Sequence, residues 1–134
     1  MKVLGKIFLV SFFLNFIWEN LHVFLYDNYM GEEITELILL RASFVDALII
    51  SVISLPFLYS GFLKSREWII IPIGFVWAIA MECYALNTGR WAYNDLMPII
   101  PLINVGLTPA IQLGLLGYVS FKLGHRLRQL SDRN

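Results

Sequence analysis

The chain has 134 residues, of which 58% are hydrophobic and only 15% are charged, and its formal net charge is zero. A soluble fold of this length could not bury so much apolar side-chain surface, and a neutral chain carries no electrostatic footprint for nucleic acid. The single cysteine, Cys83, excludes an internal disulfide and a cysteine-based metal site.

Four apolar stretches are long enough to cross a bilayer, because a spanning helix needs about 20 predominantly apolar residues. They cover residues 4–26, 34–60, 68–87 and 100–122. The lipid bilayer is therefore the expected partner of most side chains. No repeat or linker separates the stretches, so the sequence predicts one domain over residues 1–134. The expected fold class is all-α, a polytopic membrane four-helix bundle.

The positions of lysine and arginine predict the orientation of this bundle, because positively charged loops stay on the cytoplasmic side. The start of the chain, the second loop and the tail are basic, through Lys2, Lys6, Lys64, Arg66, Lys122, Arg126, Arg128 and Arg133. The first loop has no lysine or arginine, and the third has only Arg90. The sequence thus predicts a multi-pass protein of the cell membrane with both termini in the cytoplasm.

The first span carries a stripe of polar side chains. Asn15, Glu19 and His22 recur at i, i+4 and i+7, so they share one helix face, with Trp18 beside them. A charged group at membrane depth costs about 2.5 kcal/mol or more on insertion scales, so it normally faces protein or water and marks function. The stripe should therefore point into the bundle.

The other three spans carry polar side chains at a similar depth. In chain order these are Arg41, Asp46, Glu82, Tyr84, Asn104, Thr108 and Gln112. The last three lie four residues apart and should share one face of the fourth helix. Because the helices alternate in direction, all these groups are expected in the outer half of the bundle.

Two interpretations of this polar set are equally open. In a structural network, Arg41 neutralises a carboxyl group, while Asn15, Asn104 and Gln112 join helices by hydrogen bonds. In a catalytic or substrate-binding pocket, the surplus of three carboxyl groups over one arginine leaves a protonated carboxyl that donates a proton.

Two further interpretations assign the carboxyl groups to other classes of protein. A small transporter or channel subunit would pass protons or cations, which requires an oligomer and polar residues in the cytoplasmic half. An accessory protein would turn its polar stripes outward, toward a partner's helices.

Two local patterns resemble membrane enzymes. Asn15-x-x-Trp18-Glu19 resembles a helix of the fungal membrane-bound terpene cyclases that make meroterpenoids, in which the glutamate is implicated in protonating the substrate. Residues 89–109, GRWAYNDLMPIIPLINVGLTP, resemble the Gly-x-Trp-x-Tyr loop and following helix of small membrane lycopene cyclases. Those cyclases continue with paired carboxylates, whereas this chain has Gln112 where an acid is expected.

The resemblance implies acid–base chemistry, without a metal or cofactor, on an isoprenoid or another lipid-like small molecule reached from the bilayer. Glu19 is then the candidate catalytic acid, and Asp46 or Glu82 a second acid or base. The candidate substrate-binding residues are Asn15, Trp18, His22, Arg41, Tyr84, Arg90, Trp91, Tyr93, Asn104 and Gln112. Their aromatic ring faces would stabilise positive charge, although Trp91 and Tyr93 also fit the alternative of anchors at the membrane boundary.

Overall fold

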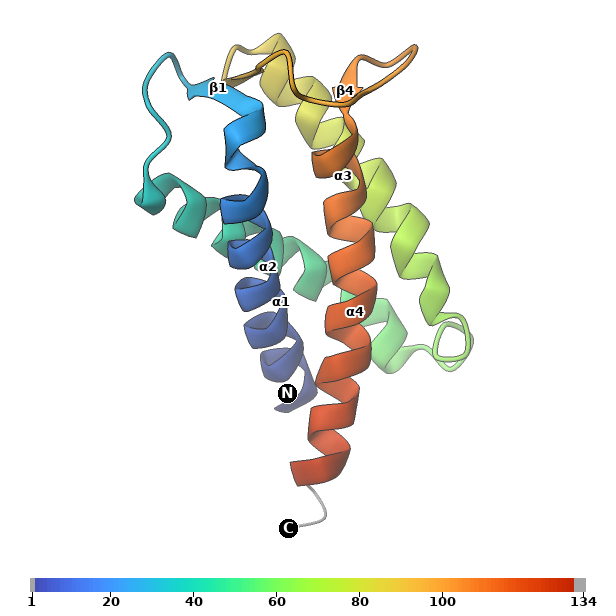
Figure 1. Cartoon of the computed structure of the whole chain (residues 1–134). Coiled ribbons are helices and arrows are strands. Elements are labelled where there is room, and N and C mark those ends of the chain that lie inside the picture. Colours follow the sequence, from blue (N-terminus) through green and yellow to red (C-terminus); the bar gives the residue numbers. More distant parts are fainter. Residues whose placement is uncertain (1, 132–134) are drawn as a thin grey trace.

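The computed structural model describes residues 2–131 of the chain, and four helices dominate it (Figure 1). They are α1 (Lys2–His22), α2 (Glu36–Tyr59), α3 (Ile70–Asn87) and α4 (Leu107–Ser131). Two short 3₁₀ turns, η1 (Val23–Leu25) and η2 (Glu67–Ile69), follow α1 and precede α3. The helices alternate in direction, so the start of α1 and the end of α4 lie at the same end of the molecule (Figure 1).

Three helical stretches are long and apolar enough to cross a membrane, namely Lys2–Leu25, Glu36–Tyr59 and Glu67–Asn87. Many large apolar side chains on these helices are exposed; Val52 and Val76, for example, are 64% and 66% exposed. An extended apolar surface of this kind marks contact with lipid or with another protein. The all-α class and the first three expected helices are confirmed, while the membrane and the orientation stay predictions.

The fourth helix differs from the expectation, because α4 begins at Leu107 and not at residue 100. Pro109 falls in its first turn, where the missing N–H leaves no helix hydrogen bond unmade, so this position suits a helix start. The prediction of a span over residues 100–122 was therefore wrong at its beginning. Among the described residues, α4 is also not one of the helices apolar enough to count as a span.

A small hairpin occupies the segment before α4. Strands β3 (Ile99–Ile100) and β4 (Val105–Gly106) pair antiparallel. The turn between them places Leu102 and Asn104 at φ angles of 78° and 53°. Left-handed backbone at two residues breaks a helix, and asparagine adopts it more readily than most residues.

A second pair of strands joins the ends of α1 and α3. Strand β1 (Tyr26–Tyr29) pairs antiparallel with β2 (Trp91–Tyr93), with Tyr26 opposite Tyr93 and Tyr29 opposite Trp91. Together with the β3–β4 hairpin, this pair covers the end of the bundle opposite to the start of α1 (Figure 1).

The helices do not pack equally on one another. Helix α4 packs extensively on α1 and α3, and α2 packs on α1, whereas α2 and α3 contact each other much less. Buried apolar side chains such as Ile7, Ile50, Ile70 and Phe121 form the core between them. Helix α2 runs obliquely to its neighbours (Figure 1), so the space between α2 and α3 is where the packing is weakest.

Candidate functional site

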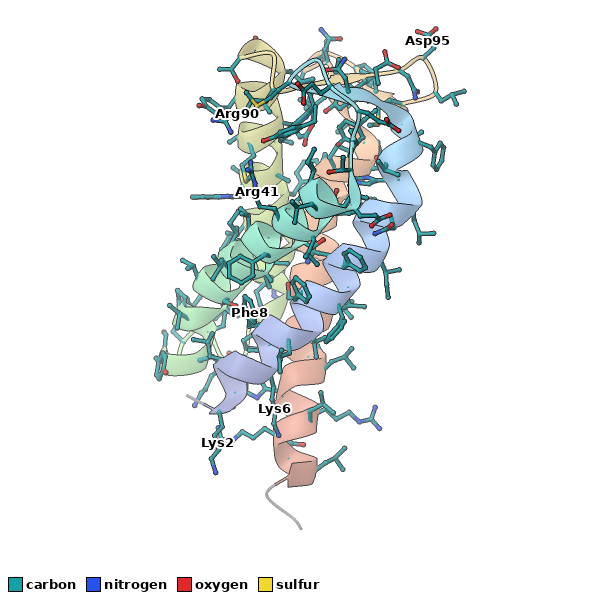
Figure 2. The ribbon with its side chains drawn as sticks, turned by 90° about the vertical axis from the view of Figure 1, so that its left-hand side faces the viewer. Lys2, Lys6, Phe8, Arg41, Arg90 and Asp95 are labelled. Atoms are coloured by element: carbon teal, nitrogen blue, oxygen red, sulfur yellow. The ribbon has the colours of Figure 1, made fainter. Side chains whose placement is uncertain are left out.

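A cavity of about 270 Å³ lies at the end of the bundle that the β1–β2 pair covers. All four helices and both strands contribute to its wall, which is mainly apolar and aromatic. Three carboxyl groups, those of Glu19, Asp46 and Glu82, line it together. Figure 2 shows Arg41 and Arg90, which also line the cavity, in the half of the molecule that lies far from the first lysines of the chain.

The amide of Gln112 connects three side chains at the floor of this cavity. Its Nε2 atom lies 3.0 Å from Asn15 Oδ1, 2.7 Å from Glu19 Oε1 and 3.0 Å from Asp46 Oδ2. The Asn15 amide nitrogen in turn donates to the backbone oxygen of Ser11 over 2.8 Å. Side chains from α1, α2 and α4 therefore meet at one point, as the polar stripe of the first span predicts.

Two hydrogens serve three oxygens in this cluster. The Gln112 amide nitrogen carries two hydrogens but lies within hydrogen-bond distance of oxygens of Asn15, Glu19 and Asp46. It therefore donates well-aligned hydrogen bonds to two of these oxygens at a time, and the third is left without a donor from this amide.

The third carboxyl group, that of Glu82, is bound by the neighbouring strand. Its Oε2 atom accepts hydrogen bonds from Trp91 Nε1, at 3.1 Å, and from the hydroxyl group of Tyr93. The Tyr93 oxygen accepts a hydrogen bond of 3.0 Å from the backbone N–H of Gly106. Tyr93, which is not part of the cavity lining, therefore connects its strand β2 to α3 through Glu82 and to β4 through Gly106.

Burial raises the pKa of the Tyr93 phenol, with the Glu82 carboxyl as the second cause, and burial likewise raises the pKa of Tyr26. In the unfolded chain these phenols ionise near their usual pKa of 10.0, whereas in the fold they stay neutral. Their contribution to stability is thus fully present below pH 10 and is lost as the pH rises further.

We expect Tyr93→Phe to lower the free energy of unfolding by about 1–3 kcal/mol at pH 7, because Glu82 and Gly106 each lose a buried partner. Above pH 10 the difference from the parent should shrink, since the parent then carries the cost of keeping this phenol neutral. Unfolding of both proteins in mixed micelles from pH 7 to 11 tests this. A difference that stays constant over the whole range would contradict it.

His22 extends the cluster toward the hairpin. Its Nε2 atom lies 3.3 Å from Glu19 Oε2, and its Nδ1 atom lies 3.4 Å from the hydroxyl oxygen of Thr108. The side chain is almost fully buried. His22 is thus positioned to orient one oxygen of Glu19, while Gln112 holds the other.

The arginines do not neutralise the carboxyl groups. Arg41 donates a 2.7 Å hydrogen bond to the Tyr29 hydroxyl. Among residues 2–131, no ion pair joins Arg41 or Arg90 to Glu19, Asp46 or Glu82. The structural-network interpretation requires Arg41 to neutralise a carboxyl group, but its guanidinium donates to Tyr29 on the β1 strand instead.

Two other residues lie elsewhere than the sequence predicts. Asn104 is exposed in the turn of the β3–β4 hairpin, so its expected place on one helix face with Thr108 and Gln112 was wrong. Trp18 packs against the hydrophobic core and does not line the cavity, and its indole N–H is buried without a hydrogen-bond partner. Tyr84 and Trp91 do line the cavity.

Sequence reasoning missed two aromatic residues of the cavity wall, Tyr26 and Tyr29. The first ends the apolar run and the second lies in the acidic loop, and neither position signals a pocket. The two tyrosines are three residues apart in YDNY, so the segment lacks the period of two that predicts a strand. Pairing with β2 brings them to the cavity, and that contact joins segments far apart in the sequence.

Comparison of the chain with protein-family models, with curated proteins and with solved structures finds no match. The function is therefore argued from the chemistry of the site. Within residues 2–131, no three His, Cys, Asp or Glu side chains are grouped so that they could hold a metal ion. The cavity wall offers carboxyl, amide, guanidinium and aromatic groups.

Proposed function

We propose that this chain is an integral membrane protein whose cavity binds an isoprenoid or similar lipid and moves a proton on it by acid–base chemistry. One observation carries the proposal: carboxyl groups from three helices line a single, largely apolar cavity. Carboxyl groups in apolar surroundings are costly, so they are expected there only when they are paired or functional. No arginine pairs with these three in the part of the chain that the structure describes.

The proposed reaction begins when the Glu19 carboxyl transfers its proton to one carbon of a substrate double bond. The π electrons form the new C–H bond, and the faces of Tyr26 and Trp91 stabilise the carbocation at the neighbouring carbon. The Asp46 carboxylate then removes a proton from an adjacent carbon, whose C–H electrons form a new double bond. The proton returns from Asp46 to Glu19, so the substrate is isomerised, or cyclised, and no co-reactant is consumed.

The resemblance to membrane terpene cyclases supports this assignment, since it implies that Glu19 protonates the substrate. Gln112, which replaces the acid of the lycopene cyclase pattern, lies within 3.0 Å of an oxygen of both Glu19 and Asp46. A neutral amide holds two acids together without adding a charge to either. Trp18 departs from the expected arrangement, because it contacts the core and not the cavity.

The rival functions have less support. An ion path would need polar groups through the other half of the bundle, where the Ser51 and Ser54 hydroxyls donate to backbone oxygens of their own helix. An accessory protein would present its carboxyl groups outward, whereas Glu82 is only 6% exposed. The carboxyl groups instead surround an internal space.

The proposed setting is a cell membrane with the cavity in its outer half. The basic residues Lys2 and Lys6 lie at the end of the bundle far from the cavity (Figure 2). Positively charged ends stay on the cytoplasmic side, which supports cytoplasmic termini.

The test measures whether the purified protein, in lipid nanodiscs, catalyses the transfer of deuterium from solvent into an isoprenoid. Acyclic isoprenoids, from farnesol to squalene, are incubated in D₂O buffer and analysed by mass spectrometry for deuterium and for cyclised products. We expect Glu19→Gln and Asp46→Asn to lower the rate of incorporation at least about 100-fold, the lower limit of general acid–base contributions.

Glu33→Gln is the matched control, because Glu33 is an exposed carboxyl in the loop before α2, and it should leave the rate unchanged. No incorporation into any isoprenoid, or a parental rate in Glu19→Gln, would refute the proposal. A strong loss of thermal stability in Glu19→Gln, without any turnover by the parent, would support the structural network instead.

A further inference from the structure

Two arginines lie at the edge of the cavity, each against a tyrosine that also lines it. The Arg41 guanidinium is 5.8 Å from the centre of the Tyr29 ring and also donates to its hydroxyl. The Arg90 guanidinium is 5.4 Å from the centre of the Tyr84 ring. Both arginines are exposed and line the cavity (Figure 2).

The backbone of Arg90 is fixed at this position. Its N–H donates to the Ala85 oxygen over 2.9 Å, and its own oxygen accepts a 2.6 Å hydrogen bond from the N–H of Met30. Gly89 makes the turn before it with a φ of 66°. The guanidinium at the end of this side chain contacts the Tyr84 ring and forms no ion pair with a carboxylate among residues 2–131. It therefore offers several N–H donors that suit a phosphate or a carboxylate.

The mouth of the cavity faces sideways. The exposed residues of the lining are Arg41, Val45, Tyr84 and Arg90, which belong to α2 or to α3 and the turn after it. These two helices contact each other less than the other neighbouring pairs do. The cavity therefore opens between α2 and α3, toward the space that lipid occupies around a spanning bundle.

The dimensions indicate which part of a ligand fits inside. Asp46 follows Arg41 by five residues, so it lies about 7.5 Å farther along α2. The cavity volume of about 270 Å³ is near the lower end of the roughly 300–1,000 Å³ of ligand pockets. Only the first carbons of a long chain fit between the arginines and the carboxyl groups, and the remainder must leave through the mouth.

We propose that the ligand is a single-chain amphiphile with an anionic head group, a phosphate or a carboxylate, held by Arg41 and Arg90. Its first double bond then lies beside Glu19 and Asp46, while the chain extends between α2 and α3 into the lipid. This inference rests on the proposed function of the same cavity and adds the class of substrate.

Binding is measured by the fluorescence of the tryptophans in nanodiscs of neutral lipid, with farnesyl phosphate, farnesol and inorganic phosphate as probes. We expect farnesyl phosphate to bind at least about tenfold more tightly than farnesol, as hydrogen bonds to a charged group provide. Arg41→Gln and Arg90→Gln should each weaken the binding of farnesyl phosphate about tenfold and leave the affinity for farnesol unchanged. Arg66→Gln, an exposed arginine in the loop between α2 and α3, is the control and should change neither.

Equal affinities for farnesyl phosphate and farnesol would overturn the inference, as would unaltered affinities in the Arg41→Gln, Arg90→Gln double variant. Inorganic phosphate binding as tightly as farnesyl phosphate would also overturn it, since the site would then be one for a free anion. The proposed function fails separately, through the deuterium assay, which the binding measurement does not use. Arginine-dependent binding without deuterium incorporation in the parent would leave the inference standing and the chemistry refuted.

Discussion

Gln112→Leu is expected to lower the free energy of unfolding by about 3–6 kcal/mol, because the two N–H donors of the amide are lost and a hydrogen bond to a charged group contributes about 1.5–3 kcal/mol. Leucine has a similar volume, so the substitution isolates the loss of the amide. The oxygens of Asn15, Glu19 and Asp46 lose the two hydrogens that Nε2 offers them, and two of these groups are carboxyls in apolar surroundings. Unfolding with SDS in mixed micelles measures the change.

Gln129→Leu is the matched control for this prediction, because Gln129 is an exposed glutamine near the end of the same helix. Its substitution should alter the free energy of unfolding by less than about 0.5 kcal/mol, as is usual for surface positions. Equal effects of the two substitutions would mean that the amide of Gln112 does not hold the cluster together. The positions of the Glu19 and Asp46 carboxyl groups would then not depend on this amide.

The helical part of the candidate site could be predicted from the sequence. It depends only on the helical repeat and on the rule that polar side chains avoid lipid. Asn15, Glu19 and His22 lie on one face of α1 through their spacing alone. Polar side chains in an apolar helix must then face other protein groups, so Asp46, Glu82 and Gln112 were expected to meet them. The structure places these side chains at one cavity or beside it, although their roles in chemistry stay predictions.

The part that could not be predicted depends on contacts between distant segments. The fourth apolar stretch contains Pro101, Asn104 and Gly106 before Leu107, but these residues do not by themselves predict which segments pair. The hairpin is defined by the pairing of β3 with β4 and by the φ angles of Leu102 and Asn104. Tyr26 and Trp91 come together through the β1–β2 pair, whose strands are too short to give a periodic signal. The direction of Trp18 was missed for a related reason, since a neighbour of a polar stripe can face either the core or the cavity.

Gly114→Ala is expected to destabilise the fold by about 1–3 kcal/mol, the usual cost of overpacking, and Gly114→Val by more. A Cβ atom at Gly114 would meet the backbone oxygen of Ile71, and one at Gly74 would meet the backbone of Gly114, all closer than 3.0 Å. Backbone atoms cannot turn aside as a flexible side chain does, so α3 and α4 would have to separate. Unfolding in mixed micelles measures the loss.

Gly5→Ala gives the opposite sign and is the matched control, because a Cβ atom at Gly5 in α1 would meet nothing within 4 Å. Alanine favours the helix over glycine by about 0.5–1 kcal/mol, so this variant should be slightly more stable than the parent. The close approach of α3 and α4 at Gly114 also affects the candidate site, since α3 carries Glu82 and α4 carries Gln112. If Gly114→Ala is as stable as Gly5→Ala, then α3 and α4 do not approach as closely as the structure shows, and the cavity wall to which both helices contribute would have another shape.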